Sequence, residues 1–229
     1  MHQFYKFLLN WSEVWPLAIA LTILLLFKQK ENVTLLTWLV VITLLLHFSG
    51  TYISMFNDKV PDIFRNNNII YNLLALTKPM FAGFYLLSLR QLKQYKFLKL
   101  ILILLPIFSL INFLFLENIF IYSSNMVLAS STFLLIFTLT FFLDAMIDDE
   151  IPLPLKHPAY FFCIGVSIFE SINFFIYLFI FPAFNTSLEF GILIMKISSY
   201  AYIFYGLILA AGFFVNRSKQ DMVTPEIPK

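Results

Sequence analysis

The chain has 229 residues, of which 60% are apolar and only 12% are charged, and its net charge is +2. A soluble domain carries about 25% charged residues, so this composition excludes a soluble globular protein. The 29 Phe residues exclude a disordered chain, and the single Cys excludes a disulfide scaffold. A near-neutral chain without a dense basic cluster offers nucleic acid no binding surface. The composition therefore indicates an all-α, multi-pass membrane protein.

Apolar runs long enough to cross a membrane occur seven times along the chain. About 20 residues at 1.5 Å each span the ~30 Å hydrocarbon layer, and continuous rather than alternating runs favour helices over barrel strands. We therefore expect one seven-helix transmembrane domain over residues 1–215 and a short, disordered cytoplasmic tail over residues 216–229. The expected spans are Trp11–Phe27, Leu35–Met55, Ile69–Leu89, Phe97–Leu116, Met126–Phe142, Tyr160–Phe181 and Phe190–Val215.

The placement of Lys and Arg predicts the orientation, because cytoplasmic loops carry the excess of positive charge. Ten of the 15 basic residues fall in the odd-numbered loops and the tail, three fall in the N-terminal segment and the even-numbered loops, and two lie inside spans. We expect the N-terminus outside and the C-terminus in the cytoplasm of a cell (inner) membrane. The ten are Lys28, Lys30, Arg90, Lys93, Lys96, Lys99, Lys156, Arg217, Lys219 and Lys229, and the three are Lys6, Lys59 and Arg65.

Lys78 and Glu170 are the only opposite charges expected at mid-depth, in the third and sixth spans. A charge there costs about 2.5–3.5 kcal/mol on insertion scales, so such residues face the bundle interior and find a partner. We expect a buried ion pair between them. The pair either fixes helix packing or belongs to a functional site, and the sequence leaves both alternatives open.

Other polar residues outline a candidate polar site in the outer half of the membrane. The inner halves of the spans are nearly pure Leu, Ile and Phe, so the outer halves form either a wet vestibule or simply the polar ends of spans. With three His in the chain, no metal cluster of ordinary spacing is expected. The candidate residues are His47, Asn112, Ser167, Ser171, Asn173, Lys196 and Tyr200.

Lys196 shares one helical face with Glu189 and Tyr200, at offsets of seven and four residues. It is expected to pair with Glu189 or Glu117, or to extend outward to the interface.

The fifth loop is the only acidic cytoplasmic loop, and proline stiffens it. Asp148, Asp149 and Glu150 form either a solvated connector or a docking site for a separate cytoplasmic signalling protein. Asp144 and Asp148 lie one helical turn apart at the end of the fifth span, where both are expected to face water.

Catalytic motifs are missing from the sequence. It contains no nucleophile elbow, no zinc-binding helix and no phosphate-binding loop. We expect no cofactor or metal, and a non-enzymatic protein is favoured over an enzyme.

The segment His157–Phe162, followed by Gly165, Glu170 and Asn173, and the Phe/Ile/Asn-rich spans resemble the seven-helix membrane sensor modules associated with histidine kinases in Bacteroidota-type genomes. The resemblance implies a non-enzymatic receptor or signalling component whose transmitter is a separate polypeptide. A channel or transporter-like protein with a polar outer vestibule is the alternative. A lipid-active intramembrane enzyme, similar to the lysoplasmalogenase type in size and texture, is a third. The expected partners are the lipid bilayer and a cytoplasmic signalling protein, and homo-oligomerisation stays open.

Overall fold

The computed structural model describes residues 2–60, 66–89, 92–147 and 156–218. Within these ranges the chain is helical, and an isolated bridge between Gln29 and Arg217 is the sole β-type pairing. The all-helical class expected from the sequence is confirmed. The helices are α1 (His2–Asn10), α2 (Trp15–Leu26), α3 (Thr34–Met55), η1 (Asn57–Lys59), α4 (Asn68–Ser88), η3 (Leu92–Gln94), α5 (Lys96–Ile111), the π-helix η4 (Asn112–Leu116), α6 (Ser124–Ile147), α7 (Pro158–Thr186) and α8 (Leu188–Val215).

Six helices in the described part of the chain are long and apolar enough to cross a membrane: α3, α4, α5 with η4, α6, α7 and α8. A helix satisfies every backbone hydrogen bond internally, so these apolar runs fold as helices in lipid. They match six of the predicted spans. The first predicted span, Trp11–Phe27, does not form one long helix. It is α2, whose 12 residues reach only ~18 Å, preceded by a turn and the separate helix α1.

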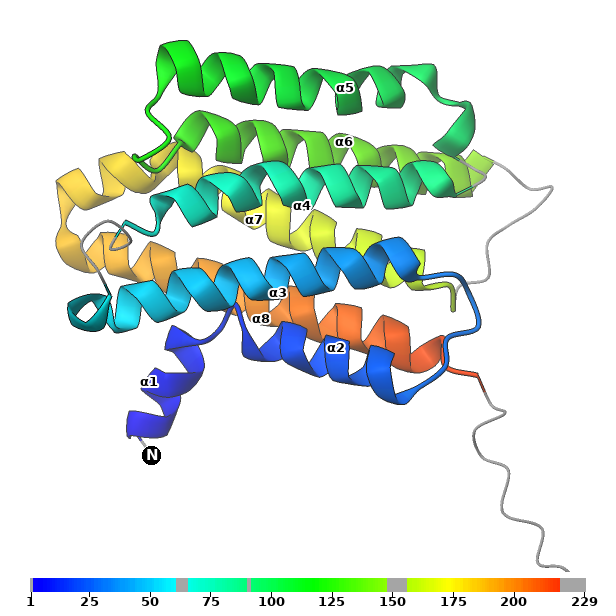
Figure 1. Ribbon diagram of the computed structural model, residues 1–229, viewed down its shortest axis with the longest axis horizontal. Coiled ribbons are helices and arrows are strands. Elements are labelled where there is room, and N and C mark those ends of the chain that lie inside the picture. The colour runs from blue at the N-terminus through cyan, green and yellow to red at the C-terminus, as the bar shows by residue number, and fades with distance from the viewer. Residues whose placement is uncertain (1, 61–65, 90–91, 148–155, 219–229) are drawn as a thin grey trace, which may run out of the picture.

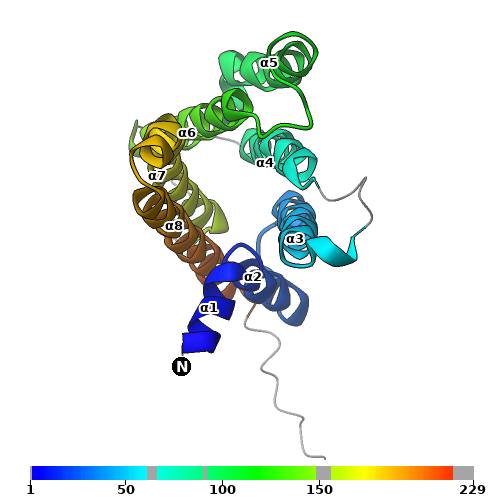
Figure 2. The same ribbon diagram turned by 90° about the vertical axis from the view of Figure 1, so that its left-hand side faces the viewer.

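Six helices form a closed ring when the bundle is viewed along its length (Figure 2). The order around the ring is α2, α3, α4, α6, α7 and α8, and α8 packs against α2 to close it. Helix α5 lies outside the ring against α4 and α6, and α1 projects from the ring below α2 in Figure 1.

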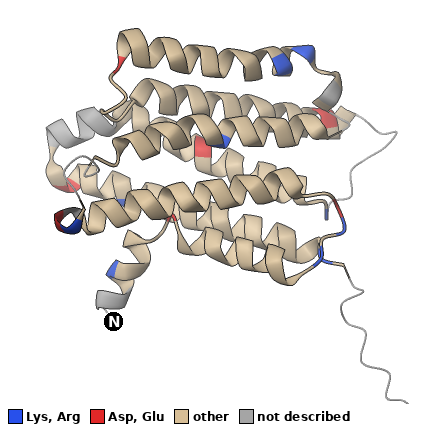
Figure 3. Ribbon diagram, viewed as in Figure 1, with Lys and Arg blue, Asp and Glu red and all other residues tan. Residues whose placement is uncertain are grey.

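We call the two ends of the bundle the Asn67 end and the Gln29 end. The Asn67 end, on the left in Figure 1, carries the α3–α4, α5–α6 and α7–α8 connections. The Gln29 end carries the α2–α3, α4–α5 and α6–α7 connections and the end of α8. Described basic residues gather at the Gln29 end, in accord with their predicted cytoplasmic location (Figure 3). The orientation itself stays a prediction.

The contact between α2 and α8 is unusually close at Gly206. A Cβ atom built on Gly206 would lie 2.5 Å from Pro16 Cβ and 3.2 Å from the Pro16 backbone carbon. Only glycine allows this approach, and Pro16 in the first turn of α2 suits the start of a helix. Gly206 lies 18 residues after the start of α8, or ~27 Å along it. Helix α2 therefore begins deep in the bundle rather than at its Asn67 end.

Helix α7 begins with Pro158, and the preceding His157 caps it through an Nδ1 that accepts the Ala159 backbone N–H at 3.1 Å. Burial lowers the pKa of His157, which keeps the imidazole neutral and its Nδ1 available as an acceptor.

Two sequence predictions fall outside the described residues. The acidic residues Asp148, Asp149 and Glu150 lie in the undescribed stretch 148–155, and most of the predicted tail lies in 219–229.

Candidate functional site

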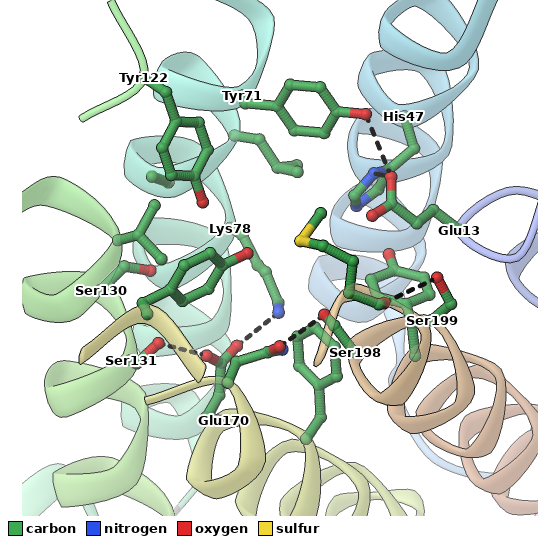
Figure 4. A pocket seen from close by; sticks show the side chains of 18 of the residues that line it. Glu13, His47, Tyr71, Lys78, Tyr122, Ser130, Ser131, Glu170, Ser198 and Ser199 are labelled. Carbon is green, nitrogen blue, oxygen red and sulfur yellow. Dashed lines mark hydrogen bonds and ion pairs between the residues drawn. The ribbon is translucent and has the colours of Figure 1, made fainter. Parts of the chain in front are cut away.

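A pocket of about 420 Å³ lies inside the ring, in the half of the bundle nearer the Asn67 end (Figure 4). Side chains from every helix of the ring except α2 line it, together with residues of the α1–α2 turn, the α3–α4 connection and the α5–α6 connection. The lining residues are Glu13, His47, Asn67, Asn68, Tyr71, Leu74, Ala75, Lys78, Tyr122, Val127, Ser130, Ser131, Phe169, Glu170, Asn173, Tyr177, Met195, Ser198, Ser199 and Tyr202.

The predicted ion pair between Lys78 and Glu170 is present at the base of the pocket. Lys78 Nζ lies 2.5 Å from Glu170 Oε1, and the side chains are 8% and 5% exposed. The second carboxylate oxygen of Glu170 accepts the Ser131 hydroxyl at 2.7 Å. Lys78 Nζ also lies over the rings of Phe169 and Tyr205, 4.3 Å and 5.3 Å from their centroids. The ammonium is thus neutralised by one carboxylate and shielded by two aromatic faces.

A second charged group, Glu13, enters the same pocket from the turn between α1 and α2. Its Oε2 accepts a hydrogen bond from His47 Nδ1 at 2.9 Å and from the Tyr71 hydroxyl at 3.3 Å. Because a carboxylate can only accept, His47 carries a proton on Nδ1. His47 is 4% exposed, whereas the Glu13 side chain is 32% exposed. Glu13 is therefore the accessible carboxylate of the pocket.

Two lining side chains have polar atoms without a partner in the described structure. His47 Nε2 and the Tyr202 hydroxyl are buried and make no hydrogen bond. The His47 and Tyr202 rings pack edge to face with their centroids 4.8 Å apart. Buried polar groups are normally satisfied, and each lost partner costs about 1–3 kcal/mol. Both atoms belong to residues of the pocket wall formed by α3 and α8.

The interrupted first span explains how Glu13 reaches mid-depth. Because α2 starts opposite Gly206, the α1–α2 turn lies inside the ring rather than at a membrane surface. The Trp15 indole N–H donates to Leu8 O at 3.1 Å across this turn. Irregular backbone at membrane depth is tolerated where protein buries it or where it lines a polar cavity. The α1–α2 turn meets both conditions, because it lies inside the ring and its Glu13 lines the pocket.

Below the Lys78–Glu170 pair the ring is closed by tightly packed side chains. Phe133 and Phe137 stack with centroids 4.4 Å apart, and the rings of Tyr85 and Phe162 meet edge to face at 5.6 Å. Leu86 on α4 is also fully buried. The pocket is therefore blind: it has a floor toward the Gln29 end.

A hydrogen-bonded loop holds Tyr122 against the pocket at the Asn67 end. The Asn72 amide donates to Ile119 O and Ile121 O, both at 2.8 Å, and its oxygen accepts the Ser123 N–H at 3.0 Å. The Tyr122 and Tyr177 rings lie 5.9 Å apart. Asn72 therefore fixes the loop that forms part of the pocket wall.

Asn112, which we expected in the intramembrane site, belongs to this loop network instead. Its amide donates to Glu117 at 3.1 Å and to the Ser123 hydroxyl at 3.0 Å. The Ser123 hydroxyl also bonds to Glu117. Glu117 is thus engaged within its own loop rather than with Lys196.

Four other predicted site residues also lie outside the pocket. Lys196 and Ser171 are exposed on the outer surface of the bundle, and within the described residues Lys196 forms no ion pair with Glu189 or Glu117. Tyr200 is exposed, and its hydroxyl contacts that of Tyr5. Ser167 donates to Thr138 at 2.8 Å within the closed half. The residues that do meet in the pocket are Lys78, Glu170, His47 and Asn173.

The expectation that Asp144 faces water is wrong, because its side chain is buried. It is 4% exposed, and its Oδ1 accepts the Tyr95 hydroxyl at 2.7 Å and the Gln94 amide at 3.3 Å. Gln94 at the end of η3 and Tyr95, which follows it, both donate to this carboxylate near the end of α6 and cover it.

Glu13 and Tyr71 belong to the polar outer half that the sequence indicates, although neither is among the candidate site residues predicted above. Tyr122, Tyr177 and Tyr202 were not predicted, because nothing in the sequence distinguishes them from the aromatic residues that face lipid.

Comparison of the chain with family models, curated proteins and solved structures finds no match. Among the described residues no cluster of three His, Cys, Asp or Glu side chains could hold a metal ion.

Proposed function

We propose that the protein is a multi-pass membrane receptor that binds a small molecule in the blind pocket and passes the signal to a separate cytoplasmic protein. The observation that carries the proposal is the combination of an open, polar outer half with a closed, aromatic inner half. Ligand pockets are concave, mostly apolar and equipped with a few polar groups, and a volume near 420 Å³ suits a small organic molecule. The packed floor supports binding rather than passage.

Thiol labelling tests whether the pocket is open on one side and closed on the other. Ser199 lines the pocket, Ser171 faces away from it, and the single native cysteine, Cys163, is buried in the closed half. In spheroplasts, a membrane-impermeant thiol reagent is expected to label Ser199→Cys from outside, and to leave the Ser171→Cys control and Cys163 unlabelled. In inverted vesicles none of the three should react.

The opposite pattern would overturn the proposal. Equal labelling of Ser199→Cys from both sides means that a path crosses the bundle, as in a channel. No labelling from either side means that the pocket is closed to water and cannot receive a ligand from outside.

A transporter is the second candidate, and the interrupted first span favours it. Broken helices at mid-depth commonly form substrate sites in transporters. Pro79 inside α4, next to Lys78, adds a second point where a span departs from regular hydrogen bonding. A transporter predicts that Ser199→Cys reacts from outside in one state and from inside in another. A receptor predicts reaction from outside only.

A further inference from the structure

The two carboxylates that line the pocket have different partners. Lys78 is balanced by Glu170 in a 2.5 Å ion pair, so neither charge is free to pair with an incoming group. Glu13 has neither Lys nor Arg beside it: its partners are the His47 imidazole, whose Nδ1 lies 2.9 Å from Oε2, and the Tyr71 hydroxyl. In the described lining, acidic residues therefore outnumber Lys and Arg by two to one.

Glu13 is also the more exposed of the two carboxylates. The Glu13 side chain is 32% exposed, whereas Glu170 is 5% exposed and bonded through both oxygens, to Lys78 and to Ser131. Only Oε2 of Glu13 takes part in the bonds to His47 and Tyr71. An occupant of the pocket therefore meets a carboxylate that can still accept.

Aromatic rings line the same pocket. Tyr71, Tyr122, Tyr177 and Tyr202 contribute to its wall together with Phe169. Ring faces attract cations through their quadrupole, and Lys78 already uses the Phe169 face in this way at 4.3 Å. A pocket that combines a carboxylate with aromatic rings suits an ammonium group. An anion would instead meet the Glu13 carboxylate in a partly desolvated site.

We propose that the pocket selects organic cations, amines with an apolar body, with Glu13 as the carboxylate that pairs with the ammonium group. The inference rests on the proposed function, because it names the ligand class of the same pocket. Leu74, Ala75 and Phe169 in the pocket wall accommodate the apolar part, while the Lys78–Glu170 pair keeps the base of the pocket electrically neutral.

The test measures charge selectivity in the full chain, in the Ser199→Cys background with Cys163→Ala. Its labelling rate is measured with two methanethiosulfonate reagents of similar size, one carrying trimethylammonium and one carrying sulfonate. Focused electrostatic potentials raise local counter-ion concentrations by about 10–1000-fold. After correction for the reagents' rates with a free thiol, we expect the cationic reagent to react at least about tenfold faster. Glu13→Gln should abolish most of this ratio, and the matched control Glu189→Gln, exposed outside the pocket, should preserve it.

A protection arm uses three probes of one shape: benzylamine, benzyl alcohol and benzoate. Benzylamine is expected to slow the labelling by an uncharged thiol reagent, and the other two are not. If Glu13→Gln does not fold, two measurements on the parent protein still test the cation preference: the ratio of the two labelling rates and the protection by the three probes.

The outcomes separate this inference from the proposed function. The proposal that the ligand is a cation is wrong if both charged reagents label the protein from outside at similar rates. It is also wrong if benzoate protects, or if none of the three probes protects. In each of these cases the proposed blind pocket is unaffected. Absence of labelling by every reagent overturns both.

Discussion

Replacing Lys78 with Met should destabilise the protein strongly, because it strands Glu170. That carboxylate is 5% exposed and would retain only the Ser131 hydroxyl, at 2.7 Å. Breaking a buried pair by removing one partner costs about 3–5 kcal/mol, and Glu170→Met should cost a similar amount by stranding the ammonium. In the double variant neither charge is left unpaired, so most of the loss should be recovered.

The double-mutant cycle measures this coupling directly. The free energy of unfolding is obtained for the parent, both single variants and the double variant by reversible SDS titration in mixed micelles, followed by circular dichroism. With singles near 4 kcal/mol and a double within about 2 kcal/mol of the parent, the coupling would reach several kcal/mol. Lys196→Met with Glu189→Gln is the matched control cycle, because these charges are exposed and form no ion pair with each other.

An additive result would refute the reasoning. If the two single changes sum to the loss in the double variant, the pair contributes no interaction free energy, despite the 2.5 Å contact. If each single variant lost less than about 1 kcal/mol of its free energy of unfolding, water would have to reach both charged groups. Ion pairs exposed to water contribute no more than this to stability.

Three further outcomes are expected. A reporter fused to the C-terminus should be active only if it functions in the cytoplasm, because the basic residues favour that side; activity of a periplasmic reporter would reverse the orientation. Gly206→Ala should lower the free energy of unfolding by roughly 1–3 kcal/mol through overpacking against Pro16, and Gly50→Ala, whose added Cβ meets only the edge of a ring at 3.3 Å, should cost less. Neutralising the acidic residues 148–150 should leave stability unchanged and abolish signalling; retained signalling would remove the partner-docking hypothesis.

The sequence predicts most of the fold because membrane burial imposes a strong physical constraint. An apolar run of about 20 residues has few alternatives to a helix in lipid, so six spans match the structure closely. The same constraint predicts the Lys78–Glu170 pair, since two opposite charges at one depth are expensive apart. The break before α2 escapes prediction because hydropathy does not record the approach of Pro16 to Gly206, which sets the depth at which the helix begins.

The polar site is harder to predict. The sequence shows which residues share one face of a helix, but not whether that face is turned toward the pocket or toward lipid. Lys196 and Tyr200 do share a face, as expected, but that face looks away from the pocket, while Ser198 and Ser199 look into it. In a chain with Phe and Ile on every side of its helices, apolar periodicity does not separate the lipid face from the interior. Only packing against neighbouring helices, such as the contact between α8 and α2, selects the inward side.

In the proposed receptor, a ligand at Glu13 would act on the turn between α1 and α2. Glu13 joins this turn to α3 through His47 and to α4 through Tyr71, so an ammonium group that draws the carboxylate toward itself would weaken both connections. Helix α2 carries that change over only 12 residues to the Gln29 end. There the α2–α3 connection is bonded to the end of the last helix: the Lys30 N–H donates to Asn216 O at 3.0 Å, and the Ser218 N–H donates to Lys28 O at 2.7 Å. In the proposed receptor, ligand binding would therefore displace α2 against this C-terminal junction, at the end of the bundle where we expect the cytoplasmic partner to bind.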